Sequence, residues 1–260
     1  MSADASTGTF LQGLERGLAV IRAFSAETPS LTLSEVARDV GITPATARRI
    51  LLTLEQLGYV RSDGRRFTLT PRVLALGWAY LSSLDLGDIA GPFMEELSAQ
   101  TRESCSIATL DLPDIVYVAR VPTRRIMTVA LGVGARLPAY ATSMGRVLLA
   151  GLPEDELTAY LESAETEQLT EHTLTSPEEL RDVVRRAGED GYALVDQELE
   201  LGLRSIAVPI LDSRGRAAAA LNVSAHASRS TKAALESEAL KPLQDCAEQI
   251  GTALRRRGRI

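Results

Sequence analysis

Arginine side chains and small hydroxyl or methyl side chains are concentrated in residues 43–66 of the chain. A guanidinium group can donate paired hydrogen bonds to a guanine edge or to phosphate, and Thr or Ala can contact base edges in a DNA groove. We predict that Ala45, Thr46 and Arg49 face base edges and that Arg48 contacts phosphate. The alternative for any single arginine is a solvated surface charge. The full candidate set is Thr43, Pro44, Ala45, Thr46, Arg48, Arg49, Arg61, Arg65 and Arg66.

Residues 33–52, LSEVARDVGITPATARRILL, have the pattern of two short amphipathic helices joined by a tight turn. Thr32 can cap the first helix, and Gly41 is expected at positive φ in the turn. Thr43 and Pro44 suit the cap and the first position of the second helix. This spacing is typical of a helix-turn-helix, and the alternative is an ordinary helical hairpin in a core. The predicted buried positions are Val36, Ala37, Val40, Ala47, Ile50, Leu51, Leu54 and Leu57.

Residues 58–70 predict a β-hairpin directly after the second helix. Gly58 ends the helix, residues 62–66 form a basic turn, and residues 67–70 alternate as a returning strand does. A helix-turn-helix followed by such a hairpin, the wing, is a winged helix. Its arginines, Arg61, Arg65 and Arg66, are expected to lie along phosphates or to enter the minor groove.

The charge of the chain is divided unevenly. The whole chain carries a net charge of −6, and its isoelectric point is near 5.2. Residues 43–72, however, hold 6 arginines against 2 acidic residues, whereas residues 73–260 hold 19 basic and 27 acidic residues. The positive field is therefore local, as expected for a small DNA-reading unit on an acidic body.

Composition excludes several other classes of protein. No apolar run approaches the roughly 20 residues that a membrane span needs, and residues 1–10 lack the regions of a signal peptide. The 2 cysteines, Cys105 and Cys246, and the 2 histidines show no metal-ligand spacing. We therefore predict a cytoplasmic protein with reduced thiols, no metal site, no cofactor and no membrane partner.

The length of 260 residues predicts two domains. A helix over about 13–25, marked by Leu14 and Leu18, is expected to pack under the helix-turn-helix. The helix after the wing has a wide apolar face that includes Trp78 and Tyr80, which predicts dimerisation, core packing or both. The predicted divisions are a DNA-binding domain at 10–71, a linker helix at 72–86, a second domain at 87–255 and a basic tail at 256–260.

The second domain alternates strand and helix patterns, with strands in the middle and helices at the ends and flanks. This order predicts an α+β fold with a mostly antiparallel sheet. The predicted strands are 104–110, 115–121, 126–131, 192–195, 205–211 and 217–225, and the predicted helices are about 88–101, 143–150, 154–163, 177–189 and 230–254.

Several motifs, taken in order, resemble the IclR family of bacterial transcription regulators. The resemblance covers nearly the whole chain and implies an N-terminal winged helix-turn-helix joined by a linker helix to a GAF-like effector-binding domain. It also implies double-stranded operator DNA as a partner, bound by a homodimer or a dimer of dimers, and leaves RNA polymerase open as a further partner. The motifs are LERGLAVIRAF at 14–24, the helix-turn-helix, LGYV at 57–60, LPAYATSMGRVLLA at 137–150 and GYALVDQELELGLRSIAVPI at 191–210.

The resemblance also implies where a small effector binds. The implicated residues are Ile126, Val129, Ser143, Met144, Leu203 and Ser205. A helix that starts at Ser143 would direct backbone N–H groups at a carboxylate. Arg120, Arg124 and Arg125 flank the same strand and could bind that carboxylate, although a turn-exposed pair is an equal alternative for Arg124 and Arg125.

VYVARVPTRRIM combined with LPAYATSMGRVLLA most resembles the subgroup that controls aromatic-acid breakdown through the β-ketoadipate pathway. This resemblance implies a small aromatic or dicarboxylic acid as effector. The first alternative is a regulator of another catabolic operon with a different small acid. A remoter one is an enzyme with Cys105 as nucleophile, although a buried structural cysteine is favoured. The third alternative is a protein-interaction module, in which the winged helix binds protein in place of DNA.

Overall fold

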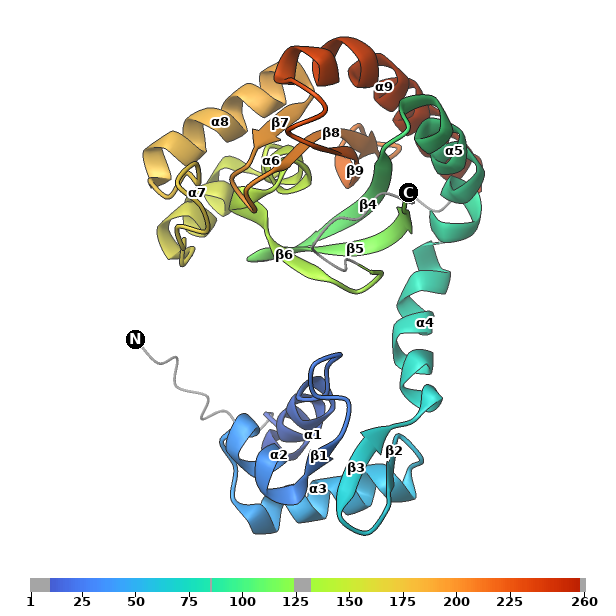
Figure 1. Ribbon diagram of the computed structural model, residues 1–260, viewed down its shortest axis with the longest axis vertical. Helices are drawn as coiled ribbons and strands as arrows, with labels where there is room; N and C mark the ends of the chain where they lie inside the picture. Colours follow the sequence, from blue (N-terminus) through green and yellow to red (C-terminus); the bar gives the residue numbers. More distant parts are fainter. Residues whose placement is uncertain (1–9, 85, 124–131, 258–260) are drawn as a thin grey trace. The chain divides into compact units, whose positions relative to one another are not determined.

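The computed structural model describes residues 10–84, 86–123 and 132–257. The chain separates into two compact units, Met1–Tyr80 and Leu81–Ile260, and the boundary falls within α4. Within the described residues, no helix is long and apolar enough to cross a membrane. The predicted α+β class is confirmed by the order of helices and strands (Figure 1).

The N-terminal unit is a small helical domain with a short antiparallel sheet in the strand order β1-β3-β2. Its hydrophobic core includes Val20, Val36, Ala47 and Leu51, all of which are fully buried. The elements are α1 (Gln12–Arg22), β1 (Leu31–Thr32), α2 (Leu33–Val40), α3 (Pro44–Gln56), β2 (Val60–Ser62), β3 (Arg66–Leu69), η1 (Pro71–Val73) and α4 (Leu74–Leu84).

Leu57, which was predicted to be buried, is exposed, and so are Leu14 and Leu18 of the helix expected to pack under the helix-turn-helix. Leu57 lies at the C-cap of α3, where the helix ends and the side chain no longer faces the core. Leu14 and Leu18 lie on the outer face of α1, whereas Val20 supplies its buried contact. The apolar periodicity of α1 is therefore real, but the N-terminal unit does not cover that face.

The C-terminal unit is built on a six-stranded antiparallel sheet in the order β6-β5-β4-β9-β8-β7. One face packs against α5 and α9, and the other packs against α6, α7 and α8 (Figure 1). The elements are α5 (Leu86–Thr101), β4 (Ser104–Asp111), β5 (Asp114–Val121), β6 (Arg136–Pro138), η2 (Ala139–Ala141), α6 (Ser143–Leu149), α7 (Glu154–Ser163), α8 (Pro177–Asp190), β7 (Ala193–Asp196), β8 (Leu203–Leu211), β9 (Ala217–His226) and α9 (Lys232–Arg256).

The C-terminal unit differs from the sequence prediction at two places. Between the predicted strand at 126–131 and the predicted helix at 143–150 lies β6, which was not predicted and which pairs with β5. Arg256, assigned to the basic tail by the prediction, is the last residue of α9, and Arg255 before it donates to the carbonyl of Leu211 at 2.9 Å. The strand predicted at 126–131 lies outside the described residues.

Candidate nucleic-acid interface and small-molecule pocket

The turn between α2 and α3 has the geometry that its residues predict. Thr32 and Glu35 form a capping box, in which Glu35 N donates to Thr32 Oγ1 at 3.3 Å and Thr32 N donates to Glu35 Oε2 at 2.7 Å. Gly41 has φ +68°, which a residue with a Cβ adopts only at a cost. The cap fixes the start of α2 and the glycine sets the turn into α3.

The start of α3 carries the residues predicted to face base edges. Thr43 caps the helix by accepting from Thr46 N at 3.2 Å, and Pro44 occupies the first turn. Thr46 is half-buried, and its hydroxyl is hydrogen-bonded to that of Thr43 at 2.9 Å. The other members of the predicted set on α3 and its cap are exposed, namely Thr43, Pro44, Ala45, Arg48 and Arg49.

The wing is a tight hairpin between β2 and β3. Asp63 Oδ1 accepts from the backbone N–H groups of Arg65 and Arg66 at 2.9 and 2.7 Å, which lowers the pKa of its carboxyl. Arg61 Nε donates to Thr68 Oγ1 at 3.0 Å across the hairpin. The three wing arginines are exposed.

Arg66 also holds the wing against α2. Its guanidinium donates to Ser30 Oγ at 2.9 Å and to the Ser30 carbonyl at 2.8 Å, and it lies 3.4 Å from Glu35 Oε2. Part of its hydrogen-bonding capacity is therefore used within the N-terminal unit. The guanidinium of Arg65 has no such partner among the described residues, which leaves it available to phosphate.

A small enclosed cavity in the C-terminal unit brings together four predicted effector residues. Ser143, Met144, Leu203 and Ser205 line a space of about 20 Å³, and Ser143 Oγ donates to Ser205 Oγ at 2.9 Å. The contact joins α6 to β8 across 62 residues of sequence. The other four predicted residues, Arg124, Arg125, Ile126 and Val129, lie outside the described residues.

Sequence reasoning missed part of the cavity wall, which also includes Tyr117, Asn222 and Ser224. Ser224 is the register partner of Ser205, and Asn222 lies two residues earlier on the same face of β9. Asn222 Nδ2 donates to Ser224 Oγ at 3.0 Å. Burial raises the pKa of Tyr117 to about 12, so its hydroxyl stays protonated. Polar residues at alternate positions of a buried strand were the signal that could have found Asn222 and Ser224.

The start of α6 and Arg120 are the two features of this face that the sequence analysis connects with a carboxylate. The helix has 7 residues, and its N-cap Thr142 accepts from Gly145 N at 3.0 Å. Arg120 lies on the same sheet face. Arg120 is the register partner of Ser106, to which its Nη1 donates at 3.4 Å, and it has no carboxylate partner among the described residues. Ser106 pairs in turn with Asn222.

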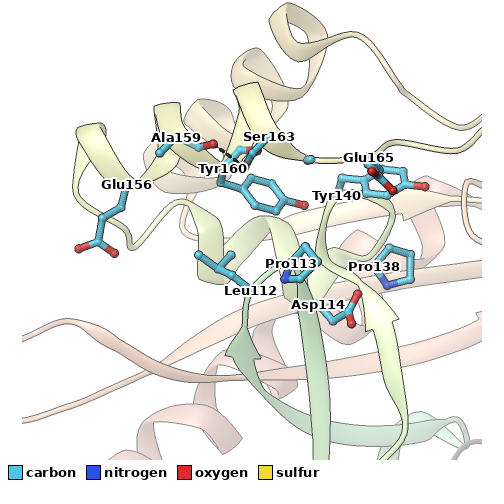
Figure 2. A pocket seen from close by; sticks show the side chains of 11 residues that line it. Leu112, Pro113, Asp114, Pro138, Tyr140, Glu156, Ala159, Tyr160, Ser163 and Glu165 are labelled. Carbon is cyan, nitrogen blue, oxygen red and sulfur yellow. Dashed lines mark hydrogen bonds between the residues drawn. The ribbon is translucent and has the colours of Figure 1, made fainter. Parts of the chain in front are cut away.

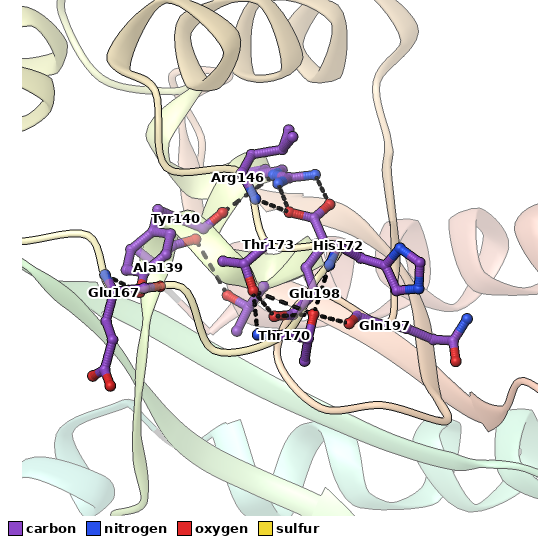
Figure 3. Close-up of polar contacts among 11 residues, drawn as sticks. Ala139, Tyr140, Arg146, Glu167, Thr170, His172, Thr173, Gln197 and Glu198 are labelled. Carbon is purple, nitrogen blue, oxygen red and sulfur yellow. Dashed lines mark hydrogen bonds and ion pairs between the residues drawn. The ribbon is translucent and has the colours of Figure 1, made fainter.

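A buried ion pair holds α6 next to the cavity (Figure 3). Arg146 donates to both carboxylate oxygens of Glu198, at 2.8 and 2.5 Å, and the side chains are 4% and 10% exposed. The backbone around Glu198 is fixed as well, because Thr173 Oγ1 donates to its carbonyl at 2.6 Å. Glu198 also accepts from Leu174 N at 3.3 Å. The pair therefore joins α6 to the two loops that precede α8 and β8.

A larger groove of about 640 Å³ lies between the β5–β6 edge and α7 (Figure 2). None of the predicted effector residues lines it. Its carboxylates, Asp114, Glu156 and Glu165, oppose the binding of an anion. The described wall of the small cavity, by contrast, has no carboxylate.

The cysteines show structural contacts. Cys105 Sγ donates to the Met94 carbonyl at 3.2 Å, and Cys246 Sγ to the Phe93 carbonyl at 3.5 Å. Burial raises the pKa of each thiol to about 12, which keeps both protonated near neutral pH. These surroundings do not support Cys105 as a nucleophile, because the thiolate is the reactive form.

Comparison with known protein families matches two separate regions of the chain. The family model described as the IclR helix-turn-helix domain matches residues 13–64, and that of the bacterial transcriptional regulator IclR C-terminal region matches residues 78–252. The chain is 48% identical over 228 residues to the Pca regulon regulatory protein of Pseudomonas putida, covering 87% of this chain and 78% of that protein.

Two crystal structures are similar over nearly the whole chain. A transcriptional regulator from Rhodococcus sp. RHA1 has a TM-score of 0.84 and 52% identity, covering 95% of this chain and 100% of that one. An IclR homologue from Microbacterium hydrocarbonoxydans, complexed with 4-hydroxybenzoate, has a TM-score of 0.82 and 26% identity, covering 94% and 99%. The chain therefore belongs to the IclR family and is a ligand-responsive, DNA-binding transcriptional regulator.

Proposed function

We propose that the chain controls genes of aromatic-acid breakdown through the β-ketoadipate pathway, and that a small aromatic acid bound at the Ser143–Ser205 cavity is its effector. The cavity carries the proposal. It combines apolar walls at Tyr117, Met144 and Leu203 with polar groups on one sheet face. Its space of about 20 Å³ has room for roughly one water, so binding of an acid requires the wall to open. The similarity to the Pca regulon regulatory protein and to the regulator complexed with 4-hydroxybenzoate supports the same class of effector.

A gel-shift titration on the DNA upstream of its own gene tests this function, with and without protocatechuate, β-ketoadipate and 4-hydroxybenzoate. We expect a specific shifted complex whose midpoint changes with at least one acid. A specific complex that responds only to other acids would favour the regulator of another catabolic operon. No binding to the region by folded protein would favour the protein-interaction module.

Arg120 is proposed as the anchor of the effector's carboxylate. Replacing it by methionine should weaken binding of the acid about 10-fold or more, because a hydrogen bond between charged groups contributes roughly 1.5–3 kcal/mol. Isothermal titration calorimetry of the variant with the responsive acid measures the loss. Arg214→Met, at an exposed turn, is the control and should bind as the wild type does. Equal affinity in Arg120→Met would reject the anchor.

The α3 and wing residues are proposed as the DNA-reading surface, with Ala45, Thr46 and Arg49 at base edges. Arg49→Ala should cost about 1–3 kcal/mol of operator affinity and much less on random DNA, since a bidentate contact to guanine discriminates between bases. Arg48→Ala is the matched comparison, because the loss of a phosphate contact weakens both DNAs alike. Fluorescence anisotropy with the two duplexes measures the difference. If Arg49→Ala weakens binding to operator and to random DNA equally, Arg49 contacts phosphate and not a base edge.

We also propose that the protein acts as a homodimer, or a dimer of dimers, in the cytoplasm. Residues 10–71 form the DNA-binding domain, 72–86 the linker and 87–255 the effector domain in this proposal. Its support is a set of large apolar side chains that are exposed, namely Leu14, Leu18, Leu74, Leu76 and Trp78.

A further inference from the structure

The Arg66 guanidinium makes its hydrogen bonds within the N-terminal unit. Its Nε donates to Ser30 Oγ at 2.9 Å, and its Nη2 donates to the Ser30 carbonyl at 2.8 Å and to Glu35 Oε2 at 3.4 Å. A guanidinium binds phosphate most strongly through two parallel N–H groups on neighbouring nitrogens, and both pairs of this kind include Nη2. Because both hydrogens of Nη2 are engaged, Arg66 has no complete pair of donors left for a phosphate.

These contacts lie at the base of the wing turn, residues 63–65. Arg66 is the first residue of β3, and the backbone pairing of β1 with β3 consists only of Leu31 with Phe67 and Thr32 with Arg66. The Arg66 side chain therefore adds contacts with the start of α2 and the segment before it to a very short pairing of strands.

The neighbouring Arg65 has the opposite arrangement. Its backbone N donates to Asp63 Oδ1 at 2.9 Å, so the turn fixes its main chain. Its side chain is exposed, and its guanidinium has no partner among the described residues. Of these two adjacent arginines, Arg65 is the one with donors for phosphate, and Arg66 is the one that joins the wing to the rest of the unit.

We infer that Arg66 is a positioning residue, which holds the wing turn against the start of α2 so that Arg65 contacts phosphate, and that Arg66 itself does not bind phosphate. The inference rests on the proposed DNA-reading surface, because it divides the roles of two residues of the wing. Without the bonds to Ser30 and Glu35 the turn has more freedom, and ordering it on DNA then costs more entropy. Loss of these bonds should therefore weaken DNA binding only in protein that retains Arg65.

A double-mutant cycle with Arg66→Lys and Arg65→Gln tests the inference. Lysine keeps the positive charge but lacks the fixed, planar donors of the guanidinium. We expect Arg65→Gln to weaken DNA binding about 5-fold or more, since a charged hydrogen bond is lost. Arg66→Lys should weaken binding about 3-fold or more alone, and less than about 1.5-fold in the Arg65→Gln background. Fluorescence anisotropy of the full-length protein on the duplex upstream of its own gene measures the affinities.

The salt dependence of binding gives a second readout. Arg65→Gln should lower the slope of log K against log salt concentration by about 1 per chain, because one phosphate contact is lost. Adding Arg66→Lys should lower it no further. Arg22→Lys, at the exposed end of α1, is the control and should change neither affinity nor slope in either background. Thermal unfolding checks that each variant is folded.

The results separate this inference from the proposed function. Additive losses in the cycle overturn the inference and leave the wing on DNA, because Arg66 then acts independently of Arg65, as a contact or through the stability of the fold. Full affinity in Arg66→Lys, with a loss in Arg65→Gln, has the same meaning. Unchanged affinity and slope in Arg65→Gln overturn both the inference and the place of the wing in the DNA-reading surface. If Arg66→Lys does not fold, Ser30→Ala, which removes one acceptor of the same guanidinium, replaces it in the cycle.

Discussion

Replacing Glu198 with alanine should lower the free energy of unfolding of the C-terminal unit by about 3–5 kcal/mol, because it leaves the Arg146 guanidinium buried without a counter-charge. The wild-type pair is bidentate, and both partners are largely removed from solvent. The variant also loses the bond from Leu174 N. Urea unfolding followed by far-UV circular dichroism measures the change, fitted with separate transitions for the two units.

Two further variants separate the buried charge from the general loss of an ion pair. Arg185 and Glu189 form an exposed pair four residues apart on α8, so Arg185→Ala should cost only about 0.3–0.5 kcal/mol. The double variant Arg146→Met with Glu198→Leu removes both charges and should be more stable than Glu198→Ala alone. A cost below about 1 kcal/mol for Glu198→Ala would show that water reaches the guanidinium.

The helix-turn-helix could be predicted from the sequence because its signals are local. The cap at Thr43, the proline at 44 and the positive φ of Gly41 each act within one or two turns of helix, and the structure has all three. The strands β1 and β6 were missed for the opposite reason. They have 2 and 3 residues, too few for a periodicity, and they exist because partners elsewhere in the sequence pair with them.

The cavity that we propose as the effector site was predictable only in part. Ser143 and Ser205 came from resemblance to a family, and the register of β8 and β9 then adds Ser224 and Asn222. The Arg146–Glu198 pair spans 52 residues, and an arginine in a helix has the same local pattern whether it is buried or solvated. Leu14 and Leu18 show a related limit, because periodicity predicts an apolar face without saying what covers it.

Gly145 is the position where the smallest substitution should disturb the cavity most. A Cβ built there would lie 2.0 Å from the Ala139 carbonyl oxygen and 2.5 Å from the Ala139 Cα, which are backbone atoms of η2. Alanine favours a helix over glycine by up to about 1 kcal/mol, but α6 must move away from η2 to admit the methyl group. We expect Gly145→Ala to destabilise the C-terminal unit by about 1–3 kcal/mol, the usual cost of overpacking.

The displacement of α6 should weaken effector binding more than it destabilises the fold. Ser143 and Arg146 flank Gly145, so the same movement separates Ser143 Oγ from Ser205 Oγ and strains the pair with Glu198. Calorimetric titration with the responsive acid should show weakened or lost binding in protein that remains folded. Gly188→Ala in α8 is the matched control, since the nearest atom to its Cβ is the methyl group of Ala150 at 3.6 Å, an ordinary van der Waals contact. That variant should gain about 0.5–1 kcal/mol and bind the acid normally. Unchanged stability and affinity in Gly145→Ala would contradict this prediction. They would mean that η2 moves to admit the methyl group without loss of stability, and that the close packing of α6 against η2 does not determine the shape of the cavity.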